Sequence, residues 1–354
     1  MLFRSDAKEK DRYMTKTKKL LVALAAVATM SLAACSSSSD TKATDSASTA
    51  STQAVKKIAF FGFWKSNSFT QAVLAGVQEA ASAAGAEVVD LSTAQYDAAA
   101  QIKAVQDQTI KGDAQMYIML ASDSVGMATA AQEAIAKGIT VVASFTPLGA
   151  KFDTLEPQVP GLIVVGETPV SNGKVLAELA ISACENKSPC NVAYLEGFKA
   201  LPLDNARTKA FVDTLKASST AANKIKLVAQ VEGGYAADSG KKAAQDVIQA
   251  HPEVNVMVGS SQAILGATDV VDVKKVALIG NGSSTEAYAN VKSGKWFALY
   301  NSDIKGMGKK SVEVGLDAAN GKKPNPVFDT QTLLDPHGTA SVIGDLTGTY
   351  SDLS

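Results

Sequence analysis

The feature that most constrains the fold is a repeated alternation of short apolar runs with segments of helical periodicity. Uninterrupted apolar runs such as 57–61 and 116–120 predict buried strands. Helical segments such as 97–111 and 124–137 lie between such runs, and a glycine ends each of them. The alternation resumes after Gly161 and continues through most of the chain. Apolar strands separated by helices predict an α/β fold with two doubly wound parallel sheets, each covered by helices on both faces.

Residues 1–34 precede this pattern and predict a lipoprotein signal peptide. A lysine-rich stretch is followed by an almost uncharged apolar run, which is too short for a convincing membrane-spanning helix. The run ends in Leu-Ala-Ala directly before Cys35, and small residues before a cysteine resemble the lipobox of bacterial lipoproteins. The alternative is an ordinary secretory signal that happens to contain a cysteine. The translation start is either Met1 or Met14.

Residues 35–54 form a tract of serine, threonine, alanine and aspartate that lacks the large apolar residues needed for a core. We expect a flexible tether that holds the folded part at the extracytoplasmic face of the membrane through lipid on Cys35. Without residues 1–34 the chain keeps 27 basic and 32 acidic residues, a net charge of −5. This charge gives no reason to expect a nucleic-acid partner.

Two further cysteines, Cys184 and Cys190, are separated by only five residues. Export to an oxidising compartment would allow them to form a disulfide. Two free thiols are the alternative.

The usual signatures of catalysis are missing from the sequence. The two histidines, His251 and His337, lie at a predicted helix end and in a turn, away from any plausible nucleophile. There is no Gly-x-Ser-x-Gly elbow, Walker loop or Gly-x-Gly-x-x-Gly after a strand, and no cluster has metal-ligand spacing. We therefore expect a protein that is not an enzyme and that holds no cofactor or metal.

Four segments together resemble the type I periplasmic-binding-protein family, in the ribose-binding-like branch of sugar ABC-transporter proteins. They are Trp-Lys-Ser-Asn-Ser-Phe at 64–69, Ala-Ile-Ala-Lys-Gly-Ile-Thr-Val-Val at 134–142, Ala-Arg-Thr-Lys-Ala-Phe at 206–211 and Ile-Leu-Gly-Ala at 264–267. Their order and spacing over the whole chain carry the resemblance.

The resemblance implies two lobes joined by a three-crossover hinge, which close on a small molecule. Lobe 1 would comprise 55–166 and 303–333, and lobe 2 would comprise 167–302 and 334–354. The resemblance also implies a monomer that delivers its ligand to ABC permease subunits. The alternative is a lipoprotein that senses a signal molecule and presents it to a membrane receptor.

The resemblance also implies a set of ligand-binding residues in the loops that follow the strands. These are Phe63, Trp64, Asn67, Phe69, Phe145, Thr146, Asn205, Tyr235, Ser260, Asn281 and Ser302. Neutral residues stand where the family has charged ones, so we expect no guanidinium–carboxylate pair in the site. A largely uncharged ligand, sugar-like or with an aromatic or aliphatic part, fits these side chains.

Overall fold

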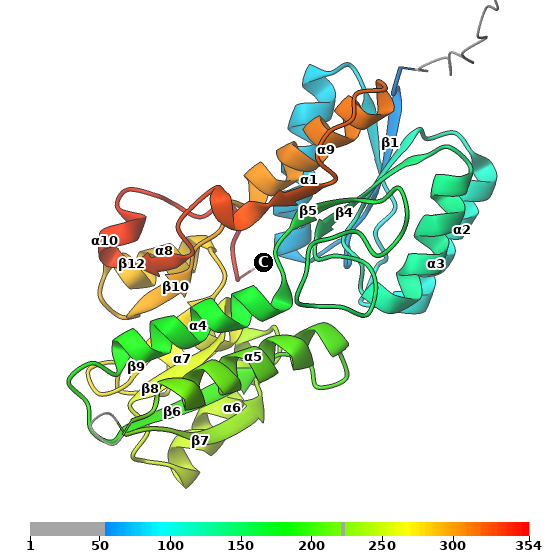
Figure 1. The fold of residues 1–354 in the computed structure, drawn as a ribbon. Helices are drawn as coiled ribbons and strands as arrows, with labels where there is room; N and C mark the ends of the chain where they lie inside the picture. The colour runs from blue at the N-terminus through cyan, green and yellow to red at the C-terminus, as the bar shows by residue number, and fades with distance from the viewer. Residues whose placement is uncertain (1–53, 221–223, 354) are drawn as a thin grey trace, which may run out of the picture. The chain divides into compact units, whose positions relative to one another are not determined.

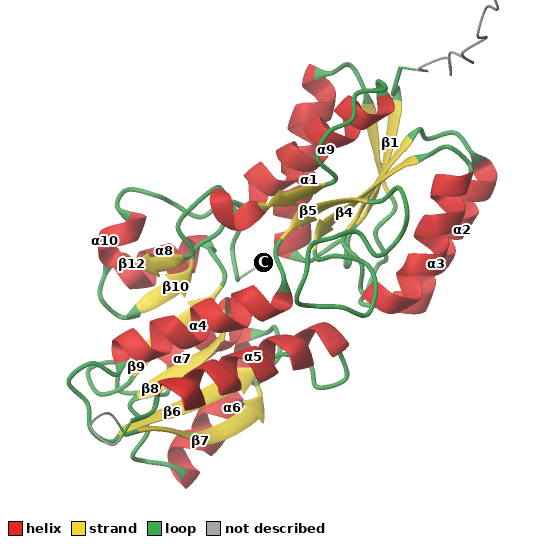
Figure 2. Ribbon diagram, in the orientation of Figure 1, coloured by secondary structure: helices red, strands yellow, loops and turns green. Residues whose placement is uncertain are grey.

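The structure is a computed structural model that describes residues 54–220 and 224–353. Its strands form two six-stranded sheets, with helices packed against them (Figure 1, Figure 2). The predicted signal peptide, Cys35 and the tether up to residue 53 lie outside the described residues. In the part of the chain that is described, no helix is both long and apolar enough to cross a membrane.

The first sheet takes five strands from the first half of the chain and one from near its end. Neighbouring strands are all parallel, in the order β11-β5-β4-β3-β1-β2. The strands are β1 Lys57–Phe61, β2 Glu87–Asp90, β3 Met116–Met119, β4 Thr140–Phe145, β5 Ile163–Gly166 and β11 Val327–Asp329. The helices of this lobe, lobe 1, are α1 Ser68–Ala83, α2 Ala98–Lys111, α3 Ser124–Ala136 and α9 Ile304–Ala319, and the short 3-10 helix η1 Thr330–Thr332 follows β11.

The second sheet has the order β12-β10-β9-β8-β6-β7, and only β12 is antiparallel to its neighbour. Its strands are β6 Cys190–Glu196, β7 Ile225–Glu232, β8 Val256–Ser260, β9 Ala277–Asn281, β10 Ala298–Tyr300 and β12 His337–Thr339. The helices of this lobe, lobe 2, are α4 Pro169–Ala183, α5 Pro202–Ser218, α6 Ala237–Ala250, α7 Ser261–Thr268, α8 Thr285–Lys292 and α10 Ala340–Ile343.

Each sheet has an apolar core on both of its faces, because successive side chains of a strand point to opposite sides. In lobe 1, α1 and α9 cover one face and α2 and α3 cover the other. In lobe 2, α4 and α5 cover one face, and α6, α7 and α8 cover the other. Burial on both faces is why the central strands are apolar along most of their length, whereas the edge strands β2 and β7 carry exposed polar residues.

The chain passes between the two sheets three times. Residues 167–168 link β5 to α4, residues 301–303 link β10 to α9, and residues 333–336 link η1 to β12. Two parallel α/β sheets joined in this way confirm the predicted fold class.

The predicted disulfide is present between Cys184 and Cys190, whose Cα atoms lie 5.5 Å apart. It joins the C-cap of α4 to the first residue of β6. The bridge therefore lies at the amino ends of the lobe 2 strands, the opposite edge from the loops that follow the strands.

Candidate ligand-binding site

A cavity of about 130 Å³ is lined by residues from both lobes and from the crossovers between them. Most of its lining comes from loops at the carboxyl ends of strands and from the helix starts that follow, where parallel sheets place their ligands. The cavity is lined by Phe63, Trp64, Asn67, Phe69, Tyr96, Ala121, Ser122, Phe145, Glu167, Asn172, Phe198, Leu201, Leu203, Arg207, Tyr235, Ser261, Gln262, Asn281, Gly282, Tyr300, Ser302, Ile304 and Tyr350.

Three phenylalanines dominate the lobe 1 side of the cavity. Phe69 and Phe145 meet edge to face with ring centroids 4.9 Å apart, and Phe63 lies 6.2 Å from Phe145. Phe145 ends β4 with φ +78°, a conformation that costs energy for a bulky residue. The backbone here is tightly packed, since a Cβ added at Gly166 would lie 2.3 Å from the Phe145 carbonyl oxygen. The neighbouring strand thus holds Phe145 in the conformation that presents its ring to the cavity.

Asn67 has a structural role as well as a place at the cavity. It is the N-cap of α1, and its Oδ1 accepts a hydrogen bond from the Thr70 amide at 2.8 Å. One of its two polar atoms is therefore already engaged, and its Nδ2 is the group left to face a ligand.

The lobe 2 side contains a buried charged group built from Asp204, Arg207 and Tyr235. Arg207 Nη1 donates to Asp204 Oδ1 at 2.6 Å and to Tyr235 Oη at 3.0 Å, and Tyr235 Oη donates to the same carboxylate oxygen. Burial alone disfavours the charged guanidinium, but Tyr235 and Asp204 outweigh this effect and raise the pKa of Arg207. Asp204 and Arg207 are 2% and 5% exposed, so the pair is shielded from water.

The Nε of Arg207 is buried and has no hydrogen-bond partner. Because Arg207 lines the cavity, we expect a ligand to engage this N–H. Asp204 balances the charge, so Arg207 offers hydrogen bonds without adding net charge to the site.

The crossovers contribute a second buried polar group around Glu167. Tyr300 donates to Glu167 Oε2, Asn172 donates to Oε1 at 3.1 Å, and Gln331 donates to Tyr300 Oη at 2.8 Å. Asn172 also bonds the Asn281 side chain at 3.1 Å. Burial raises the pKa of Glu167 to about 7, and the hydrogen bond from Tyr300 opposes the shift only in part.

Tyr350, close to the end of the chain, also lines the cavity. Tyr350 Oη accepts a hydrogen bond from the Ser283 amide at 3.1 Å, and its ring lies 6.1 Å from that of Phe69. The buried Asp352 accepts from Ser284 Oγ, the N-cap of α8. These contacts fix the last turn of chain against α8 and bring Tyr350 next to the lobe 1 rings.

Of the eleven residues predicted to bind ligand, the structure brings eight to the cavity: Phe63, Trp64, Asn67, Phe69, Phe145, Tyr235, Asn281 and Ser302. The remaining three do not line it. Thr146, the residue after Phe145, is buried and only 3% exposed. Ser260 is the N-cap of α7, and its hydroxyl donates to the Gly234 carbonyl. Asn205 is exposed, and its amide donates to the Lys199 carbonyl at 3.0 Å.

The prediction that the site lacks a guanidinium–carboxylate pair is wrong. Matching the family's arginine to Asn205 overlooked Arg207, which lies two positions further along α5. Helical geometry places Asp204 and Arg207, three residues apart, on the same buried face of α5. That spacing was visible in the sequence and was the signal for the pair.

The aromatic residues Tyr96, Phe198, Tyr300 and Tyr350 line the cavity but were not predicted from the sequence, and neither were Glu167 and Asn172. Glu167 follows an apolar strand directly, which is a signal for a functional carboxylate. Tyr96, Phe198 and Tyr350 lie in loops or in the tail and carry no comparable signal.

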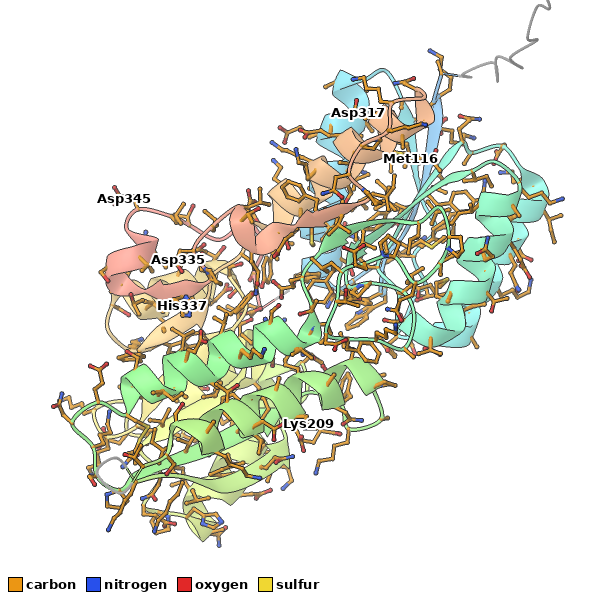
Figure 3. The ribbon with its side chains drawn as sticks, in the orientation of Figure 1. Met116, Lys209, Asp317, Asp335, His337 and Asp345 are labelled. Atoms are coloured by element: carbon orange, nitrogen blue, oxygen red, sulfur yellow. A yellow bond between two sulfur atoms is a disulfide. The ribbon has the colours of Figure 1, made fainter. Side chains whose placement is uncertain are left out.

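Neither histidine lines the cavity. His337 is the first residue of β12, and Figure 3 shows it near Asp335. Its Nε2 lies 2.9 Å from Glu178 Oε2. Within 54–220 and 224–353, no group of three or more histidine, cysteine, aspartate or glutamate residues is arranged to hold a metal ion.

Comparison with known families identifies the class of the protein. Residues 58–323 match the family described as periplasmic binding protein domain. The match covers most of the chain, so the chain belongs to this family. It is a family of binding proteins, in agreement with the prediction that the chain is not an enzyme. A comparison with curated proteins finds no significant relative.

Solved structures share the fold at low sequence identity. A periplasmic component of an ABC-type sugar transport system from Hahella chejuensis is 19% identical, with a TM-score of 0.67 over 77% of this chain and 97% of its own. An ABC-transporter solute-binding protein from Agrobacterium vitis with bound D-fucose is 18% identical, with a TM-score of 0.68 over 82% and 97%. A structure described as the XylFII–LytSN complex is 20% identical, with a TM-score of 0.65 over 77% and 96%.

Proposed function

We propose that this protein is the lipid-anchored, extracytoplasmic solute-binding component of an ABC importer and captures a sugar-like, largely uncharged ligand. The observation that carries the proposal is the cavity lined from both lobes and from the hinge. A ligand there contacts both lobes only when they are closed, so its binding energy favours the closed form. That form is the one that permease subunits would recognise.

The chemistry of the cavity supports an uncharged ligand. Arg207 is neutralised by Asp204, Asn172 and Asn281 are neutral amides, and burial disfavours the charged form of Glu167, whose pKa is raised to about 7. Aromatic rings such as Phe69 and Phe145 suit the apolar face of a sugar ring. The bound D-fucose named for the Agrobacterium vitis protein is in line with this class.

A ligand screen by thermal unfolding tests the proposal. The purified protein would be heated with D-fucose, D-ribose, D-glucose, D-galactose and D-allose, one at a time. A ligand present at 100 times its Kd stabilises the folded state by about 2.7 kcal/mol, which raises Tm by several degrees. The affinity should change little between 50 and 500 mM salt because no net charge is paired on binding. A folded protein that no sugar stabilises would contradict the proposed ligand class.

The anchor has its own test. Cys35→Ser should release the protein from the membrane fraction or leave it with an uncleaved signal peptide. The Cys184→Ser, Cys190→Ser double variant is the matched control, and it should stay in the membrane fraction. A Cys35→Ser protein that is processed and membrane-bound like the wild type would place the anchor elsewhere.

A second candidate is a sensor lipoprotein that presents its ligand to a membrane receptor. The structural neighbour described as the XylFII–LytSN complex supports this candidate, because a protein of the same fold is there in complex with another protein. Genes for a permease and an ATPase beside the gene for this chain would favour the importer. A receptor gene in that position, with no permease gene nearby, would favour the sensor.

A further inference from the structure

Apart from Tyr300, which bonds Glu167, the aromatic residues of the cavity fall into two sets that pack separately. The inner aromatic set is Phe63, Phe69, Phe145 and Tyr350, whose rings contact one another. The crossing aromatic set is Trp64, Tyr96, Phe198 and Tyr235, with successive centroid distances of 5.8, 6.4 and 5.2 Å. Trp64 and Tyr96 belong to lobe 1, whereas Phe198 and Tyr235 belong to lobe 2. The crossing aromatic set therefore runs from one lobe to the other along one side of the cavity.

A second cavity, of about 310 Å³, adjoins the first beside the crossing aromatic set. The two share Tyr96, Ser122, Leu201 and Leu203 as lining residues. The rest of the second cavity is lined by Ala98, Asp123, Ser124, Val125, Phe152, Ala200 and Pro202. Its Asp123 carboxylate already caps α3 by accepting from two backbone amides. This cavity thus offers mainly apolar surface to an occupant.

The polar side chains gathered at the crossovers belong to the first cavity alone. Glu167, Asn172, Asn281, Tyr300 and Ser302 all line it, and none of them lines the second cavity. The site as a whole is therefore divided into a polar part at the hinge and an aromatic part that opens into an apolar chamber.

Buried charge supports the rings of the crossing aromatic set from lobe 2. Asp204 Oδ2 accepts from the Phe198 amide at 2.8 Å, and Asp204 Oδ1 accepts from Tyr235 Oη at 2.6 Å. One carboxylate thus fixes both lobe 2 rings, and Arg207 Nε remains as a donor beside them. A rigid pair of rings with a nearby N–H donor suits a planar ring that carries an acceptor, such as a ring nitrogen or a carbonyl.

We propose that the ligand is a monosaccharide joined to a planar unsaturated ring, the chemistry shared by nucleosides and aryl glycosides. The inference rests on the proposed function and extends it from a sugar to a sugar with a planar substituent. The sugar lies in the first cavity against the hinge polar groups, and the planar ring packs on the crossing aromatic set and extends towards the second cavity. A free monosaccharide leaves the crossing set and the second cavity without a partner.

Matched pairs of probes test this by isothermal titration calorimetry on the purified protein. The pairs are D-ribose with uridine or adenosine, and D-fucose, D-glucose and D-galactose each with its 4-nitrophenyl β-glycoside. We expect at least one glycoside to bind about tenfold or more tightly than its free sugar, because ring stacking adds to the sugar contacts. The nucleosides and the nitrophenyl glycosides separate the two sources of a planar ring.

Two variants test whether the tighter binding of a glycoside depends on the second cavity. Phe152→Ala and Val125→Ser alter residues that line only the second cavity, and Val125 is 46% exposed, so the second variant should fold normally. Each should reduce the ratio of glycoside to free-sugar affinity several-fold. The control Ile110→Ala removes an apolar side chain that is 85% exposed on α2 and should leave the ratio unchanged.

The outcomes separate this inference from the proposed function. A free sugar that binds as tightly as every glycoside tested overturns the inference and leaves the sugar-binding function standing. A tighter glycoside whose advantage survives in both variants also overturns it, because the ring then lies elsewhere. If neither sugars nor glycosides bind the folded protein, the proposed ligand class fails as well.

Discussion

The two lobes differ in how much polar surface they offer to the same cavity. Lobe 1 presents rings, and of its two polar lining residues Asn67 has its acceptor engaged in capping α1. Lobe 2 presents amides, hydroxyls and the pair formed by Asp204 and Arg207, in addition to the rings of Phe198 and Tyr235. Neither lobe alone covers a ligand that has both an apolar face and a polar edge. The difference explains why such a ligand needs the closed form, since each lobe satisfies only half of it.

The largest expected effect comes from breaking the lobe 2 pair. Asp204→Ala leaves the Arg207 charge, the Tyr235 hydroxyl and the Phe198 amide without their shared acceptor. Removal of one member of a buried ion pair costs about 3–5 kcal/mol of the free energy of unfolding. Urea denaturation measures the loss. The adjacent Asn205→Ala, on the exposed face of the same helix, should cost about 0.5 kcal/mol or less. Equal losses in the two variants would show that the pair is not supporting this lobe.

The second effect is a pH dependence from Glu167 at the hinge. Its pKa is raised to about 7 in the folded protein from an ordinary 4.5, and it faces Tyr300, Asn172, Arg207 and Asp329. The folded state therefore holds a proton that the unfolded chain has released, and the resulting stabilisation is lost as the pH rises through 7. Between pH 5 and 8 the free energy of unfolding should fall by on the order of 3 kcal/mol.

Glu167→Gln isolates that contribution. Asp352, with its pKa raised to about 6 by burial, acts in the same direction in both proteins. The difference between wild type and Glu167→Gln should therefore depend on pH even if each protein alone does so for other reasons. A difference that stays constant from pH 5 to 8 would mean that Glu167 is ionised throughout.

Removal of the disulfide changes lobe 2 at a place remote from the residues that line the cavity. Reduction of the bridge, or the Cys184→Ala, Cys190→Ala variant, should lower the free energy of unfolding by about 2 kcal/mol for so short a loop. Ligand affinity should stay within twofold, because the bridge lies at the far edge of the sheet. A large loss of affinity would show that the wall of lobe 2 depends on this distant edge.

The smallest effect, on ligand affinity, is expected from shortening an aromatic side chain of lobe 1 that lines the cavity. Phe69→Leu keeps most of the apolar volume and removes the ring, so the loss is about 1 kcal/mol of binding free energy, or roughly fivefold in Kd. Titration calorimetry with the best ligand of the screen measures it. Lys65→Ala, at an exposed position in the loop that precedes α1, is the control. Unchanged affinity in Phe69→Leu would remove this ring from the binding surface.

The sequence predicted the fold well, because strands buried on both faces are apolar along their length. It did not predict α9, which contains Gly306, Gly308 and Gly315 and so lacks a strong helical signal. These glycines serve packing: a Cβ added at Gly308 would lie 2.2 Å from the Val73 carbonyl oxygen of α1. Such a close approach of two helices is a tertiary constraint that local periodicity does not contain.

The candidate site was predictable where it follows a strand directly and unpredictable elsewhere. Phe63, Phe145 and Asn281 come at or just after strand ends, and the position alone brought them to the cavity. Thr146 failed by one residue: it follows the left-handed Phe145 in a bend of the chain, is 3% exposed and does not line the cavity. Tyr350 is some 280 residues from Phe69 in the sequence, and only the packing of the tail on α8 brings the two rings together.

A crystal structure with the tightest ligand of the screen tests the division between the two lobes most directly. The account predicts the ligand in the cavity, with its apolar face on Phe63, Phe69 and Phe145 and its polar edge towards Asn172, Asn281 and Arg207. The Nε of Arg207 should donate to it. A ligand bound outside this cavity, or one whose hydroxyls face the phenylalanines while its apolar face lies on the lobe 2 amides, would contradict the account.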